Sequence, residues 1–239
     1  MKKLLIIPAV LAVAACQPKQ NNGPSDALSF GLLGDVKEVY VTQSIESSTD
    51  EDLAEIVPTT GEERLEFTYD ADGRITLDTF GLPYEYDADG AFVGGSGKKT
   101  TLERDAKGRI VSYDNTHVED EDDYEDLDIE SFFSYVFDYD NQNRVVKEEI
   151  SGWEWCDTYE YTYEGDKPYP ASATFVSGAE GWNEEGDIKF EYTAFDDKGN
   201  WTERLETYTV KAYEEGFEEE AQNYTTVYKK VRRFVYWSE

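Results

Sequence analysis

The densest group of side chains that could bind an ion is an acidic run at residues 119–130, where nine of twelve residues carry carboxylates. Carboxylate oxygens are preferred ligands of Ca²⁺. The run lacks the glycine and the acid spacing of a preformed calcium loop, so it predicts only weak, salt-sensitive Ca²⁺ association. The alternative is a solvated loop that joins two strands. The candidate ligands are Asp120, Asp122, Asp123, Asp126 and Asp128.

Groups for covalent or metal catalysis are scarce, because the chain has one histidine, His117, and two cysteines, Cys16 and Cys156. It contains no hydrolase nucleophile motif, phosphate-binding loop or zinc-binding helix motif. Two carboxylates can hydrolyse a glycoside, but 53 acidic residues allow so many pairs that no pair is informative. We expect no catalytic residue, no cofactor and no enzymatic activity, with a glycan-acting hydrolase as a remaining alternative.

Exposed aromatic side chains can stack on sugar rings, and all five tryptophans lie within residues 153–237. Trp182 lies in a polar, glycine-rich segment at residues 177–186, which indicates a turn with an exposed side chain. Trp153 and Trp155 are in phase with the tyrosines of an expected strand, which favours packing in the core. Trp201 is also expected in the core. The candidates for ligand binding are Trp182, Trp153 and Trp155.

The charge of the chain limits its partners. With 53 acidic and 22 basic residues, the formal charge is −31. A surface this negative repels phosphate backbones, so we expect no nucleic-acid partner. Aromatic residues make up 15 % of the chain, and the apolar area that they supply indicates a folded domain rather than disorder.

An internal repeat indicates which elements position these side chains. An aromatic residue is followed by Asp-x-x-Gly, and the aspartates are spaced by 17, 18, 35 and 56 residues, close to multiples of one period. Apolar and polar residues alternate before each turn, which is typical of half-buried strands, and Asp-x-x-Gly favours a tight turn. The repeat turns are marked by Tyr69, Asp70, Gly73, Tyr86, Asp87, Gly90, Asp105, Gly108, Tyr139, Asp140, Asn143, Asp196 and Gly199.

Each repeat is therefore expected to form one β-hairpin. Isolated hairpins are marginally stable, so the repeats must share a sheet. We predict an all-β fold, an antiparallel meander of repeated β-hairpins that forms one curved sheet or an open barrel-like shell. A single domain is expected over residues 28–239, with charged side chains pointing outward and protecting the sheet edges.

The stretch Tyr69-Asp70-Ala-Asp-Gly73-Arg74-Ile75 resembles the YD repeat, also called the RHS repeat, of large secreted and surface proteins. The chain also resembles small bacterial lipoproteins that carry a few such repeats. In the large members the repeats build a spiralling antiparallel shell, which this chain is too short to close. The resemblance implies a hairpin architecture and supplies no catalytic residue.

Residues 1–15 have the features of a lipoprotein signal peptide, with two lysines followed by an apolar run. The run ends in Val13-Ala14-Ala15-Cys16, which resembles the bacterial lipobox and implies lipidation of Cys16 and a membrane as partner. The alternative is an ordinary cleaved signal peptide. Residues 16–27 predict a flexible tether after the lipidated cysteine. The expected location is the outer membrane of a Gram-negative-type cell envelope, facing the periplasm.

These features favour a lipid-anchored cell-envelope binding module with an aromatic-rich β surface, whose expected ligand is a glycan. The alternative is a structural or assembly lipoprotein that docks another envelope protein through exposed strand edges.

Overall fold

The computed structural model describes residues 25–50, 53, 59–77, 83–94, 101–114, 134–152 and 154–237. Cys16, His117, Trp153 and the predicted Ca²⁺ ligands between residues 120 and 128 lie outside the described residues. The elements are α1 (Asp26–Ser29), β1 (Val36–Ser48), β2 (Thr59–Thr60), β3 (Arg64–Tyr69), β4 (Ile75–Leu77), β5 (Glu85–Tyr86), β6 (Phe92–Gly94), β7 (Thr101–Arg104), β8 (Ile110–Asp114), β9 (Ser134–Tyr139), β10 (Val145–Ser151), β11 (Trp155–Thr162), β12 (Ser172–Ala179), β13 (Trp182–Phe195), β14 (Trp201–Glu214), the 3₁₀ helix η3 (Glu218–Glu220) and β15 (Gln222–Tyr236).

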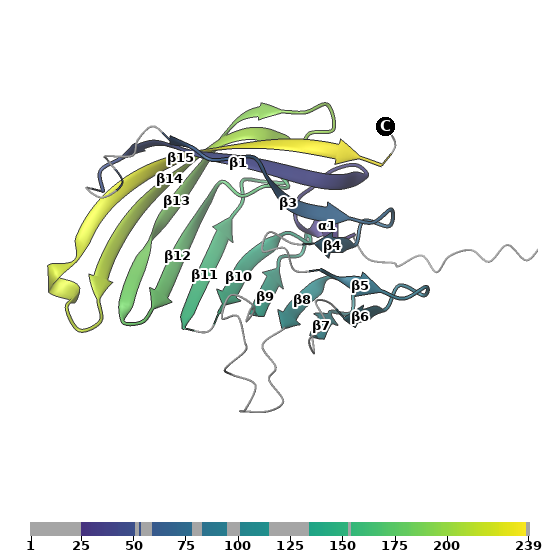
Figure 1. The fold of residues 1–239 in the computed structure, drawn as a ribbon, viewed down its shortest axis with the longest axis horizontal. Coiled ribbons are helices and arrows are strands. Elements are labelled where there is room, and N and C mark those ends of the chain that lie inside the picture. Colours follow the sequence, from purple (N-terminus) through teal and green to yellow (C-terminus); the bar gives the residue numbers. More distant parts are fainter. Residues whose placement is uncertain are drawn as a thin grey trace, which may run out of the picture.

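Most strands join one antiparallel sheet of 13 strands, in the order β4-β3-β1-β15-β14-β13-β12-β11-β10-β9-β8-β7, with β2 paired to β1. Neighbours in the sheet are consecutive along the chain, except where β1 pairs with β15 and where it pairs with β3, past the short β2. The sheet curls strongly, as Figure 1 shows, and the hairpin β5–β6 forms a separate small sheet near its two edges. The shell does not close, because its edge strands β4 and β7 do not pair. The predicted all-β curved sheet is confirmed.

The repeat turns join β3–β4, β5–β6, β7–β8, β9–β10 and β13–β14, as the sequence predicts. In the first of them, Asp70 Oδ1 accepts the backbone N–H groups of Asp72 and Arg74, each at 2.9 Å. The fourth turn residue needs a left-handed conformation, with φ of 74° at Gly73 and 67° at Asn143. Glycine and asparagine adopt this conformation most readily, which explains the residue types of the repeat.

The arginine that follows the turn links successive hairpins. Arg144 Nε donates to Asp140 Oδ2 at 2.7 Å, and its guanidinium lies 4.3 Å from the ring centre of Tyr163, which directly follows β11. The Tyr163 hydroxyl donates back to the Val145 carbonyl at 2.7 Å. Because a guanidinium is planar, it can pair with a carboxylate and stack on a ring at the same time.

The N-terminal described segment, residues 25–34, crosses the end of the shell where the repeat turns lie. The Ala27 N–H donates to the Gly73 carbonyl at 3.2 Å, near the first repeat turn. The Leu33 N–H donates to Asn200 Oδ1 at 2.7 Å, next to the last repeat turn. The segment therefore closes this end of the shell.

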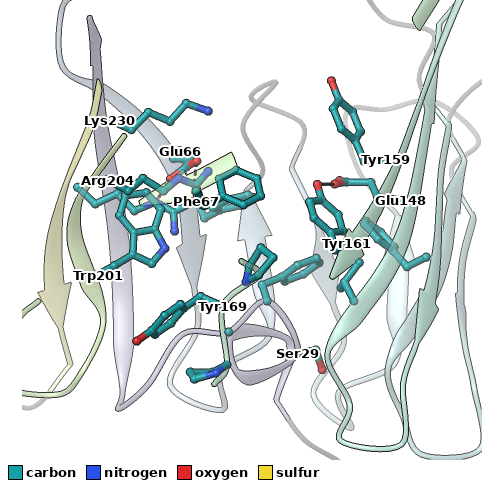
Figure 2. Close-up of a pocket in the computed structure, with 18 of the residues that line it drawn as sticks. Ser29, Glu66, Phe67, Glu148, Tyr159, Tyr161, Tyr169, Trp201, Arg204 and Lys230 are labelled. Atoms are coloured by element: carbon teal, nitrogen blue, oxygen red, sulfur yellow. Dashed lines mark hydrogen bonds and ion pairs between the residues drawn. The ribbon is translucent and has the colours of Figure 1, made fainter. Parts of the chain in front are cut away.

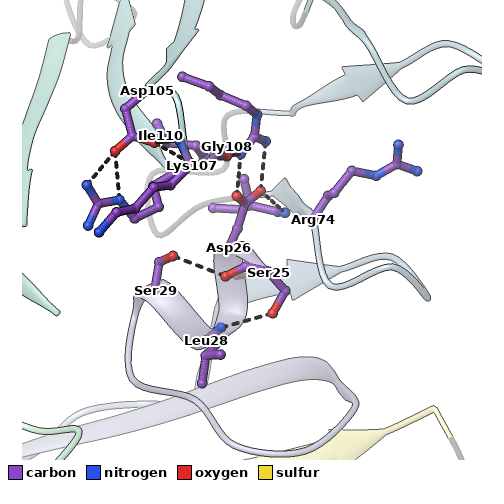
Figure 3. A network of polar contacts seen from close by, with 12 residues as sticks. Ser25, Asp26, Leu28, Ser29, Arg74, Asp105, Lys107, Gly108 and Ile110 are labelled. Carbon is purple, nitrogen blue, oxygen red and sulfur yellow. Dashed lines mark hydrogen bonds and ion pairs between the residues drawn. The ribbon is translucent and has the colours of Figure 1, made fainter. Parts of the chain in front are cut away.

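The carboxylate of Asp26 connects the two edge strands of the sheet. Its side chain is 2 % exposed and accepts the N–H of Ile75, in edge strand β4, at 3.0 Å. It also accepts from Arg104 of edge strand β7, at 2.6 and 3.0 Å. Figure 3 shows this network beside α1. The side chain of Ser25 caps the N-terminus of this helix by accepting the backbone N–H of Leu28. Residues 25–27 of the predicted tether therefore belong to the fold, and residues 16–24 lie outside the described residues.

Candidate ligand-binding site

The inner face of the shell surrounds a cavity of about 360 Å³, which we call the inner cavity. Figure 2 shows Trp201 and Arg204 on one wall and Glu148 and Tyr161 on the facing wall. Ser29, at the end of α1, lines the closed end. A volume of this size is within the range of small-ligand sites.

One wall of the inner cavity carries a buried carboxylate, Glu206, which is 1 % exposed. Arg204 Nε donates to Glu206 Oε1 at 2.6 Å, and Lys230 Nζ lies 3.1 Å from the same oxygen. Burial alone would raise the pKa of Glu206, but the charges of Lys230 and Arg204 outweigh it and lower the pKa to about 2. Glu206 is therefore ionised at neutral pH.

A second ion pair lies beside the first. Arg232 forms a two-point contact with Glu66, with its Nε 2.7 Å from Oε2 and its Nη2 2.9 Å from Oε1. The Trp201 ring lies between the two arginines, 4.3 Å from Arg204 and 4.1 Å from Arg232. Trp201 is 5 % exposed, so its predicted place in the core is confirmed. These contacts hold the charged wall in one arrangement.

The facing wall carries a carboxylate of opposite character. Glu148 accepts a hydrogen bond from the Tyr161 hydroxyl at 2.8 Å. Within the described residues no basic side chain pairs with it, and burial raises its pKa. The inner cavity therefore brings together an ionised carboxylate and one that binds a proton more readily than usual.

Toward the open end of the shell, the inner cavity continues into a second cavity of about 320 Å³, which we call the outer cavity. Tyr159, Glu206 and Tyr208 line both cavities, so the two form one continuous concave surface. The residues that line only the outer cavity are Gln43, Asp157, Phe175, Ser177, Glu184, Tyr224, Thr226 and Tyr228.

The sheet register places two of the predicted ligand-binding tryptophans beside the outer cavity. Trp155 pairs with Ala179, which pairs with Trp182, so both rings lie on one face of the sheet. Asp157 and Glu184 follow two residues further along these strands and therefore share that face. Trp182 is 43 % exposed, which confirms its predicted exposure. Trp155 is half-buried and packs against the core.

Some predictions about this region are wrong in detail. The predicted turn at residues 177–186 consists mostly of the ends of β12 and β13. Charged residues were expected to point outward, yet Glu66, Glu148 and Glu206 line the inner cavity. The signal for the charged wall was present, because Arg204 and Glu206 share the alternation phase of the buried Val210.

No known protein family and no curated protein matches the chain. Among the described residues, no helix is long and apolar enough to cross a bilayer. The same part of the chain contains no group of three or more His, Cys, Asp or Glu side chains placed to hold a metal ion.

Proposed function

We propose that the protein is a binding module of the cell envelope that takes a glycan on its concave face. The observation that carries the proposal is the inner cavity, which combines the rings of Tyr159 and Tyr161 with fixed polar groups. Sugars offer apolar ring faces together with many hydroxyls, so they suit sites that mix aromatic surface with preoriented hydrogen-bonding groups.

The polar groups of the inner cavity have spare hydrogen-bonding capacity. Each carboxylate can accept several hydrogen bonds, and among the described residues only the Tyr161 hydroxyl donates to Glu148. Arg64 also lines the inner cavity and remains exposed. A polyhydroxylated ligand could therefore satisfy groups that water satisfies in the free protein.

A binding screen against oligosaccharides and peptidoglycan fragments tests the proposal. We expect Glu148→Ala to weaken glycan binding about tenfold, the usual cost of a lost charged hydrogen bond. The matched control is Glu149→Ala, because Glu149 is the next residue, lies on the opposite face of β10 and pairs with Lys147. No binding to any member of the panel, or equal loss in both variants, would contradict the proposal.

A glycan-acting hydrolase is a second candidate, because Glu148 and Glu206 line one cavity and have pKa values shifted in opposite directions. A carboxyl group that binds a proton more readily than usual and an ionised carboxylate are the two kinds of group that glycoside hydrolysis requires. Incubation with the same panel, followed by chromatography, distinguishes the two functions. Product that forms with the wild type and is absent with Glu148→Gln would favour the hydrolase.

The location in the envelope is a separate proposal, which rests on the sequence of residues 1–16 alone. Growth with a labelled fatty acid should label the wild-type protein, whereas Cys16→Ser should remain unlabelled and leave the membrane fraction. Labelling of the serine variant would contradict lipidation at Cys16.

A further inference from the structure

The outer cavity differs in chemistry from the inner cavity that we assign to a glycan. Five aromatic rings line it, from Tyr159, Phe175, Tyr208, Tyr224 and Tyr228. Three carboxylates also line it, from Asp157, Glu184 and Glu206, and within the described chain no lysine or arginine does. An aromatic wall combined with unbalanced negative charge is the composition that binds organic cations.

The rings form one connected set rather than isolated side chains. Tyr208 packs edge-to-face against both Phe175 and Tyr228, with ring centres 5.7 and 5.3 Å apart. Tyr159 stacks on the other side of Phe175 at 6.3 Å. These contacts hold the ring orientations, so little side-chain freedom is lost when a ligand binds. The tyrosines are half-buried and remain open to the cavity.

Two of the three carboxylates lack a counter-charge. Glu206 is balanced by Arg204 and Lys230 on the inner side. Glu184 accepts a hydrogen bond from the Tyr224 hydroxyl at 2.8 Å, and no basic side chain of the described residues pairs with it or with Asp157. Burial, and to a smaller extent the charge of Glu184, raises the pKa of Asp157.

The charge of Glu184 also reaches the rings. Burial is the largest cause of the raised pKa of Tyr224 and of Tyr228. The charge of Glu184 also raises both pKa values, and its hydrogen bond with Tyr224 raises that of Tyr224 further. Negative charge beside the tyrosine hydroxyls makes the cavity unfavourable for an anion. The same negative charge would attract a bound cation.

We propose that the outer cavity is a binding site for an organic cation, an alkylated ammonium group held against the tyrosine rings and paired with Asp157 and Glu184. An alkylated ammonium fits better than a metal ion, because five of the eleven residues that line the cavity are aromatic and hard metal ions require more oxygen ligands. The volume of about 320 Å³ leaves room for such a group and part of the molecule that carries it. This inference does not depend on what the inner cavity binds.

The probe for the test is choline, compared with its uncharged isostere 3,3-dimethyl-1-butanol at constant ionic strength. Both ligands have a single sharp methyl resonance, so saturation-transfer NMR reports binding of each to the full-length protein. We expect choline to bind at least about tenfold more tightly, because only choline gains the charge and cation–π terms. This comparison uses the wild-type protein and needs no variant to fold.

Variants then locate the site. Glu184→Gln and Asp157→Asn should each weaken choline binding about tenfold and leave the weak binding of the neutral isostere unchanged. The matched control is Glu185→Gln, because Glu185 is adjacent in sequence, lies outside the cavity lining and pairs with Lys211. Thermal unfolding confirms that each variant is folded.

Three results would overturn the inference. They are absence of choline binding, equal binding of choline and the neutral isostere, and choline binding that both cavity substitutions leave unchanged. None of them bears on glycan binding in the inner cavity, which Glu148→Ala tests separately.

Discussion

The guanidinium carbon of Arg109 lies 4.3 Å from the ring centre of Tyr139, so the arginine of one repeat stacks on the aromatic residue of the next. The same guanidinium pairs with Asp105 in its own turn. The repeat that lacks this arginine has Ala91 in its place, and the following repeat has Arg104 at the aromatic position. The arginine and the aromatic residue of the motif are therefore partners between hairpins.

The first prediction concerns this stacking. We expect Arg109→Lys to lower the free energy of unfolding by about 2 kcal/mol, because a lysine can neither pair at two points with Asp105 nor stack on Tyr139. The control is Arg233→Lys, which removes the same kind of pair with Glu63 and the same kind of stack on Tyr40 at an exposed site. There we expect a smaller loss, because water screens an exposed pair. Chemical denaturation measures both, and equal losses would contradict the prediction.

The second prediction concerns the link between the two sheet edges. Asp26→Ala removes the acceptor of the Ile75 N–H and the carboxylate that pairs with the Arg104 guanidinium, which keeps its bond to the Gly108 carbonyl. We expect a loss of about 3 kcal/mol in the free energy of unfolding, and faster hydrogen exchange confined to β4 and β7. Asp72→Ala is the control, because Asp72 pairs with Arg74 at 3.3 Å but is 78 % exposed. Normal exchange at both edges in the Asp26 variant would refute the link.

The third prediction is a pH dependence due to Glu206. Its folded-state pKa of about 2 lies below the ordinary value of 4.5. The ionised group therefore stabilises the fold above pH 4.5, and this contribution, of order 3 kcal/mol, is lost as the pH falls from 4.5 toward about 2. Glu206→Gln should be less stable than the wild type at pH 7, with a gap that narrows below pH 4.5. Urea denaturation over this pH range measures the gap, and a constant gap would contradict the assignment.

The fourth prediction has the opposite sign. Burial raises the pKa of Glu148 above its ordinary value of 4.5, so the ionised form destabilises the fold at neutral pH and this cost disappears below pH 4.5. Glu148→Gln keeps an acceptor for Tyr161 and removes the charge. We expect it to raise the free energy of unfolding by about 1 kcal/mol at pH 7 and to have no effect at pH 4 or below. If Glu148→Gln were less stable than the wild type at pH 7, the prediction would be wrong, and the charge of Glu148 would be compensated in the folded protein.

The local structure was predictable from the sequence because its determinants are close in the chain. Asp70 and Gly73 define a turn within four residues, and the alternation around Tyr135 and Phe137 identifies a half-buried strand. The contacts of Asp26 were not predictable, because its partners lie 49 and 78 residues away in the chain. No local sequence pattern indicates contacts between residues so far apart in the chain.

The interior charges were missed for a different reason. Strand alternation assigns Arg204 and Glu206 to one face, but it does not show whether that face surrounds a cavity or solvent. Glu66 has the phase of the polar residues in β3, which predicts an outward side chain. However, the pairing of β3 with β1 shifts register between Val39 and Tyr40, and Glu66 lines the inner cavity. Such a bulge breaks the simple alternation, and sequence periodicity does not reveal it.

The pairing of β1 with β15 sets the order in which the chain can complete its sheet. During synthesis, β1 emerges from the ribosome before every other described strand, while its partner β15 emerges after all of them. One edge of β1 therefore remains unpaired while the hairpins that lie between β1 and β15 in the chain form from local contacts. The pairing of β1 with β15 is thus the last event of folding. A chain interrupted before β15 would expose the unpaired edge of β1 to chaperones, proteases or other chains.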